Sequence, residues 1–71
     1  MSNSSAEVGE RIRKVRLEAG MSQEELSFKS GLHRTYISDA ERGNRNLTIR
    51  TLVAIARALG VKPAELLEGI E

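Results

Sequence analysis

The spacing of four glycines constrains the fold of this chain more than any other feature: Gly20, Gly31, Gly43 and Gly60. Each follows a stretch in which apolar residues recur at helical spacing, and no stretch shows the alternation typical of a strand. A glycine just after a helix takes the left-handed conformation at little cost, so each of the four marks a helix end. The sequence therefore predicts an all-α fold of short helices joined by short connections.

Local start signals place five helices. Ser22 and Glu25 can form a capping box, in which each side chain accepts a hydrogen bond from the backbone amide of the other residue. Thr48 can act as an N-cap, and Pro63 stands at a favoured first helical position. His33 precedes another helix, although imidazole is a poor cap. The expected helices cover about residues 6–19, 22–30, 33–42, 48–59 and 63 onward, packed as a compact five-helix bundle.

The composition limits the other possibilities. A chain of 71 residues without cysteine and with one histidine predicts a single domain with no disulfide, metal site or cofactor. We expect residues 1–5 to be a disordered lead-in and residues 6–71 to be the domain. No apolar run approaches the ~20 residues of a membrane span, and the polar start is unlike a secretory signal. The expectation is a cytoplasmic protein with no membrane partner and no small-molecule ligand.

Charge is distributed unevenly along the chain. The net charge is only +1, but residues 11–50 hold nine Lys or Arg against five Asp or Glu, whereas both ends are acidic. A basic central segment suits a surface that faces phosphates. A solvated surface of mixed charge would give the same count, and Arg11, Arg13, Lys14 and Arg16 are expected to belong mostly to such a surface.

The second and third expected helices are joined by a tight turn at Gly31-Leu32, which predicts a helix-turn-helix over about Ser22–Gly43. In that motif the second helix enters the major groove and its first residues meet base edges. Those residues are Arg34, Thr35 and Tyr36. Arginine can donate two hydrogen bonds to guanine, and a threonine methyl can touch thymine. Tyr36 could instead be half-buried against the preceding helix.

Backbone contacts are expected on either side of this reading helix. Gln23 lies at a helix N-terminus, where free amides favour a phosphate. The loop after the third helix holds Arg42, Asn44, Arg45 and Asn46, which suit contacts that set register without reading sequence. Arg42 has an alternative role, which is to pair with an acidic neighbour and hold the fold.

The chain resembles the lambda-repressor and Cro-like helix-turn-helix family from about Gly9 to Leu67. The residues that carry the resemblance are Gln23-Glu24-Glu25-Leu26, Gly31-Leu32, Tyr36-Ile37-Ser38, Glu41-Arg42-Gly43, Leu52, Ile55-Ala56, Ala58-Leu59-Gly60-Val61 and Pro63-Ala64-Glu65-Leu66-Leu67. The segments 32–38 and 41–48 look like the controller proteins of restriction–modification systems. This narrower resemblance implies base contacts for Arg34, Thr35 and Tyr36, and phosphate or groove contacts for Ser38 and the loop residues. Ala40 departs from the family pattern, where a larger aliphatic residue is common, and predicts looser packing.

A small domain buries only about 60% of its unfolded surface, so a partner subunit is a natural source of further stability. Val53, Val61, Leu67 and Ile70 exceed what one small core needs, and we expect them to form a homodimer interface. The alternative is that they only complete the core. Leu17 and Phe28 lie off the expected apolar faces, and partial burial is the expectation for both.

Together these features predict a homodimeric regulator that binds double-stranded DNA at a palindromic operator. A controller of its own gene and of an endonuclease gene is the specific form. The alternatives are a phage-type or antitoxin-type repressor, or a protein-interaction module on the same fold. An enzyme is not expected, because His33 has no nucleophile partner and the chain lacks a glycine-rich phosphate loop and a metal-binding carboxylate cluster.

Overall fold

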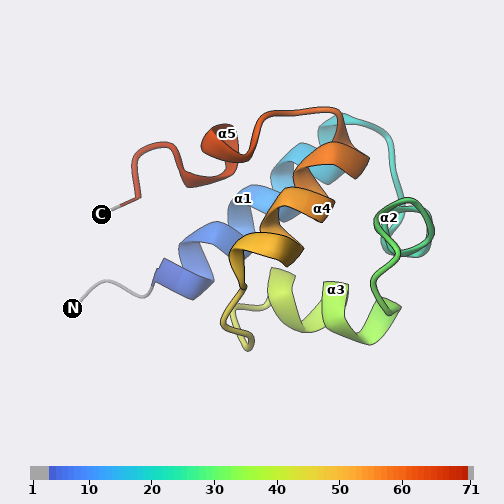
Figure 1. The fold of residues 1–71 in the computed structure, drawn as a ribbon, viewed down its shortest axis with the longest axis horizontal. Helices are drawn as coiled ribbons and strands as arrows, with labels where there is room; N and C mark the ends of the chain where they lie inside the picture. Colours follow the sequence, from blue (N-terminus) through green and yellow to red (C-terminus); the bar gives the residue numbers. More distant parts are fainter. Residues whose placement is uncertain (1–3, 71) are drawn as a thin grey trace.

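The computed structural model describes residues 4–70 and contains five α-helices (Figure 1). This confirms the all-α five-helix prediction. No helix within 4–70 has the length and apolar character needed to cross a membrane. The helices are α1 (Ser4–Glu18), α2 (Gln23–Ser30), α3 (Arg34–Glu41), α4 (Ile49–Leu59) and α5 (Pro63–Leu67).

The first helix starts earlier than the sequence predicts. Ser4 and Ser5 belong to α1, so the expected disordered lead-in is wrong for these two residues. The remainder of that lead-in, residues 1–3, lies outside the described residues. The Ser5 hydroxyl donates a hydrogen bond to Asn46 Oδ1 at 3.2 Å. The start of α1 is therefore attached to the loop that follows α3.

One side chain from each helix meets at the centre of the molecule. Each of the five is fully buried, and burying an aliphatic side chain of this size contributes roughly 1.5–3 kcal/mol. Because every helix supplies one, loss of any helix would open the core. These residues are Ile12, Leu26, Ile37, Ile55 and Leu66.

The helix starts follow the expected capping chemistry. In the capping box, Glu25 N donates to Ser22 Oγ at 3.0 Å and Ser22 N donates to Glu25 Oε1 at 3.2 Å. Thr48 caps α4 in the same way with Thr51 in place of a glutamate. At α3, His33 Nδ1 accepts from the amide of Thr35 at 3.1 Å, so the imidazole does serve as the cap.

A buried ion pair joins α1 to the end of α3. Arg16 Nε donates to Glu41 Oε2 at 2.6 Å, and the two side chains are 9% and 2% exposed. The expectation that Arg16 is solvated is therefore wrong. The hydrogen bond that Arg16 donates to Glu41 raises the pKa of Arg16, whereas burial lowers it by less. Gln23 completes the cluster, because its Nε2 donates to Glu41 Oε1 at 3.0 Å. Three helices thus meet at one carboxylate.

Arg11 is the second basic residue of α1 that leaves the expected solvated surface. Its guanidinium donates to the backbone oxygens of Glu65 and Glu68 at 2.9 and 2.8 Å. These carbonyls belong to the end of α5, where helical carbonyls lack partners within the helix. Arg11 therefore fastens α5 to α1.

Close backbone packing brings α1 against α3. A Cβ atom placed on Gly9 would lie 2.2 Å from the carbonyl oxygen of Ala40 and 2.8 Å from that of Glu41. Ala40 itself is buried. The looser packing expected around Ala40 is therefore wrong, because α1 approaches α3 here to the distance that only glycine allows.

Candidate nucleic-acid interface

The turn between α2 and α3 orients α3 so that the start of the helix is exposed and the remainder packs against the core. Gly31 ends α2 with φ of 74°, in the left-handed region that favours glycine. The Ser27 hydroxyl donates to the backbone oxygen of Leu32 at 2.7 Å and fixes the turn. Ile37, near the middle of α3, is buried in the core. The first turn of α3 consequently projects outward, as a helix-turn-helix requires.

Two of the three residues expected to read bases are exposed. Arg34 and Thr35 lie in the first turn of α3, and within residues 4–70 their side chains make no hydrogen bond or ion pair. An exposed guanidinium whose N–H groups have no partner within these residues is open to guanine recognition. The structure thus places both residues where the sequence predicts them, and their contact with bases stays a prediction.

Tyr36 is oriented differently from its two neighbours. Its hydroxyl donates to Thr51 Oγ1 at 3.0 Å, which attaches it to the cap of α4. The guanidinium of Arg45 lies over the tyrosine ring, 4.8 Å from its centroid. Such a cation–π contact is typically worth about 0.5–1 kcal/mol at an exposed site. Tyr36 is half-buried, as the alternative interpretation of the sequence expects, but its hydrogen bond and its cation–π contact are with α4 and the loop and not with the preceding helix α2.

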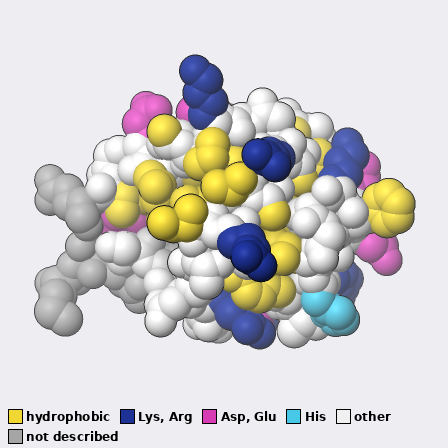
Figure 2. All heavy atoms as spheres, viewed as in Figure 1, with side chains coloured by type: hydrophobic (Ala, Val, Ile, Leu, Met, Phe, Trp, Pro, Cys, Tyr) yellow, Lys and Arg dark blue, Asp and Glu magenta, His cyan; other side chains and the backbone are white. Residues whose placement is uncertain are grey.

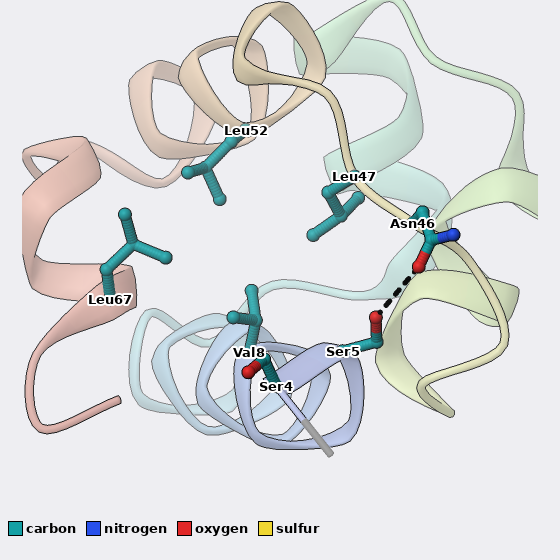
Figure 3. A pocket seen from close by; sticks show the side chains of 7 residues that line it. All are labelled: Ser4, Ser5, Val8, Asn46, Leu47, Leu52 and Leu67. Atoms are coloured by element: carbon teal, nitrogen blue, oxygen red, sulfur yellow. Dashed lines mark hydrogen bonds between the residues drawn. The ribbon is translucent and has the colours of Figure 1, made fainter. Parts of the chain in front are cut away.

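The loop after α3 gathers four of the residues expected to contact the DNA backbone. Asp39 accepts from Arg42 at 2.9 Å and from Arg45 at 3.5 Å, so one carboxylate lies between the two arginines. The backbone amide of Asn44 donates to the backbone oxygen of Asp39 at 2.9 Å. Asn46 is exposed, and its contact with α1 is drawn in Figure 3. The expected alternative for Arg42, pairing with an acidic neighbour, is thus present.

Gln23 and Ser38 are less available than the loop residues. The Gln23 amide nitrogen is committed to Glu41, as described above, and its side chain is half-buried. Ser38 is also half-buried, and its backbone oxygen accepts from the amide of Arg42 at 3.2 Å. The structure therefore gives Gln23 a role in holding α2 to α3, whereas the bond of Ser38 belongs to the end of α3 itself. Their phosphate contacts stay predictions.

The four residues expected at a dimer interface divide into two groups. Val61 and Ile70 are partly buried and pack against the core, which matches the alternative that they complete it. Val53 is half-buried, and Leu67 is 44% exposed. Sequence reasoning missed Ile49, which is 82% exposed at the first position of α4. Figure 2 shows hydrophobic side chains gathered over α4 and the adjoining parts of α1 and α5.

An apolar pocket opens beside Leu67 (Figure 3). Its volume is about 190 Å³, and it lies between the start of α1, the loop before α4 and α5. The side chains of Val8, Leu47 and Leu52 point into it from three sides. The full lining is Ser4, Ser5, Val8, Asn46, Leu47, Leu52 and Leu67.

Asp39 and Thr51, which contact the residues expected to bind DNA, have roles that sequence reasoning missed. Asp39 is three residues before Arg42, a spacing at which helical side chains meet, so the pair could have been anticipated. Thr51 is three residues after Thr48, where a capping box places its second member. Its additional bond with Tyr36 depends on how α3 packs near α4, which local spacing does not encode.

Residues 12–66 match the model of a helix-turn-helix family. The chain belongs to this family. Among curated relatives, the control protein C.BamHI of Bacillus amyloliquefaciens is 51% identical over 61 residues, which cover 84% of this chain and 75% of that protein. The resemblance inferred from the sequence is thereby confirmed.

Solved structures of helix-turn-helix proteins show the same fold. The restriction–modification controller protein C.AhdI from Aeromonas hydrophila matches with a TM-score of 0.84 and 43% identity, covering 86% of this chain and 92% of that one. The controller protein C.Esp1396I matches with a TM-score of 0.86 and 47% identity, covering 96% and 90%. C.Esp1396I has also been solved as a tetramer in complex with its natural 35 base-pair operator.

Proposed function

We propose that this chain is a DNA-binding transcriptional regulator of the restriction–modification controller type, acting in the cytoplasm as a homodimer on a palindromic operator. The observation that carries the proposal is that the side chains of Arg34 and Thr35, in the first turn of α3, are exposed and unpaired within residues 4–70, on a chain whose relatives are controller proteins. The operator complex of C.Esp1396I supports DNA as the partner.

Base reading is assigned to Arg34 and Thr35, with Tyr36 beside them. Arg34 donates to a guanine edge in the major groove, and the methyl of Thr35 contacts thymine. Arg42, Asn44, Arg45 and Asn46 hold the phosphate backbone on one side of α3. Gln23, at the first position of α2, and Ser38, near the middle of α3, are assigned further contacts with the DNA backbone. So few base contacts give limited discrimination, and a dimer doubles them.

Dimerisation is assigned to the apolar surface around Leu67. Leu67 and Ile49 are large exposed apolar side chains, and the pocket between α1 and α5 offers a receptor for such a side chain. Val53 extends this surface along α4, whereas Val61 and Ile70 support it from the core. Replacing Leu67 with glutamate is expected to yield a folded monomer in sedimentation velocity, since the position is not part of the core.

A gel-shift assay with the DNA upstream of the gene tests the function. The wild-type chain is expected to bind that duplex far more tightly than an unrelated duplex of equal length. The Arg34→Ala variant is expected to lose about 1–3 kcal/mol of specific affinity, roughly 5- to 150-fold. Arg13→Ala, an exposed arginine of α1, is the matched control. Equal binding of both duplexes by the wild-type chain would favour a protein-interaction module instead.

A further inference from the structure

The most unusual charge arrangement in the proposed interface is a carboxylate between its two loop arginines. Asp39 Oδ1 accepts from Arg42 Nη2 at 2.9 Å, and Asp39 Oδ2 accepts from Arg45 Nη2 at 3.5 Å. The Asp39 side chain is 24% exposed, against 64% for Arg42 and 45% for Arg45. One negative charge therefore lies among the positive charges assigned to DNA phosphates.

Stability of the protein does not account for this carboxylate. Asp39 is in the last turn of α3, where the helix dipole disfavours a negative charge. Ion pairs between exposed side chains contribute little to the free energy of unfolding, because water screens them and the side chains lose entropy. In both ion pairs of Asp39 the arginine side chain is exposed in this way. The arrangement calls for a role outside folding.

A carboxylate and a phosphodiester offer a guanidinium the same kind of acceptor, namely charged oxygens that can take one or two N–H bonds. A DNA phosphate that approaches Arg42 or Arg45 consequently meets a competitor for the same donors and a like charge. Arg45 is held less tightly, because its bond to Asp39 is the longer one and its other contact is the ring of Tyr36.

We infer that Asp39 is an internal counter-ion that DNA phosphate displaces from Arg45 and Arg42, and that it thereby lowers the affinity for DNA of any sequence. The inference rests on the proposed function, in which these arginines contact the DNA backbone. In the free protein the two arginines are partly neutralised. In the complex, phosphate oxygens replace the carboxylate at one or both guanidinium groups.

Asp39→Asn tests this, because asparagine keeps the size of the side chain and removes its charge. Binding is measured by fluorescence anisotropy to the upstream duplex and to an unrelated duplex across a range of salt concentrations. The variant is expected to bind both duplexes roughly fivefold more tightly at low salt, as the loss of an exposed ion pair implies. The plot of log K against log salt is expected to steepen by up to about 0.9, the value for one further phosphate.

Glu10→Gln is the matched control. It removes an equal charge from an exposed position of α1 that lies beside Gly69 and Ile70. Its affinity is expected to equal that of the wild-type chain. If net charge alone set the affinity for DNA, Glu10→Gln and Asp39→Asn would raise it equally, and that result would overturn the inference. In a background of Arg42→Ala with Arg45→Ala, the effect of Asp39→Asn is expected to vanish, and its persistence would also be contradictory.

The outcomes separate this inference from the proposed function. If the wild-type chain binds both duplexes equally, the proposed function fails. If the wild-type chain prefers the upstream duplex but Asp39→Asn binds no more tightly, Asp39 is not a competitor; weaker binding would make it a positioning residue for the arginines. Circular dichroism checks the fold of each variant. Should asparagine disturb it, Asp39→Ala repeats the test with a residue that favours helix.

Discussion

Replacing Gly9 with alanine sets two physical effects of opposite sign against each other. Alanine in the interior of α1 favours the helix by about 1 kcal/mol over glycine. The added Cβ, however, would lie 2.2 Å from the carbonyl oxygen of Ala40, well inside any permitted contact. The added Cβ is bonded directly to the backbone of α1 and the oxygen belongs to the backbone of α3, so no flexible side chain can move aside. Relief therefore requires α1 and α3 to separate.

Overpacking of a tightly packed interior costs typically 1–3 kcal/mol. A backbone contact this short belongs at or above the upper end of that range, so the clash outweighs the gain in helix propensity. The expected net loss is about 2 kcal/mol. For a domain of this size that corresponds to a fall in Tm of roughly 8–16 °C. It is a large share of a total stability of roughly 4–11 kcal/mol, the usual range for such a length.

Urea denaturation followed by far-ultraviolet circular dichroism measures this loss as a lower midpoint. Glu10→Ala serves as the control, because Glu10 is the next residue of α1, is exposed and becomes the same alanine without adding an atom to the α1–α3 contact. The control is expected to be as stable as the wild-type chain. A Gly9→Ala variant that matched or exceeded wild-type stability would show that α1 and α3 do not approach as closely as described.

Three further outcomes are expected. Glu41→Ala leaves Arg16 buried without its partner and is expected to lower the free energy of unfolding by about 3–5 kcal/mol. The double variant Arg16→Met with Glu41→Leu is expected to lose far less stability, because no buried charge is left unpaired. A Tm of Glu41→Ala within a few degrees of the wild-type value would contradict this. Tyr36→Phe removes the donor to Thr51 and is expected to lower the unfolding free energy by about 0.5–1.5 kcal/mol in urea, while an unchanged midpoint would show that the bond adds nothing. Phe28→Ser is expected to change stability by less than about 0.5 kcal/mol, because the ring is 89% exposed.

Much of the fold is predictable because its signals are local. The capping box at Ser22 and the glycine after each of several helices act within one or two turns of chain, and the structure has them where the sequence places them. The buried residues of α4 also follow from helical periodicity alone. The error at Ser4 and Ser5 has a different origin. Asn46, distant in sequence, accepts a hydrogen bond from Ser5 in this first turn of α1, and no local rule contains that contact.

The candidate site is predictable in its outline but not in its internal contacts. Exposure of Arg34 and Thr35 follows from their place in the motif. That Arg16 is buried does not, because an arginine among other basic residues looks solvated until Glu41 is placed beside it. Phe28 shows the reverse case, since an aromatic ring was expected to be at least partly buried. In each instance the packing of one helix on another decides, and the sequence of a single helix carries no record of it.

The division of α3 into an exposed first turn and a packed remainder has a consequence for how such proteins diversify. The side chains of Arg34 and Thr35 are exposed and make no hydrogen bond or ion pair within residues 4–70, whereas Ile37, Ala40 and Glu41 hold the helix to α1 and the core. Substitutions of Arg34 and Thr35 are therefore expected to cost little free energy of unfolding, whereas those of Ile37, Ala40 and Glu41 are expected to cost more. Under the proposed function, in which this turn reads bases, a single substitution at Arg34 or Thr35 would change operator preference on a scaffold that stays the same.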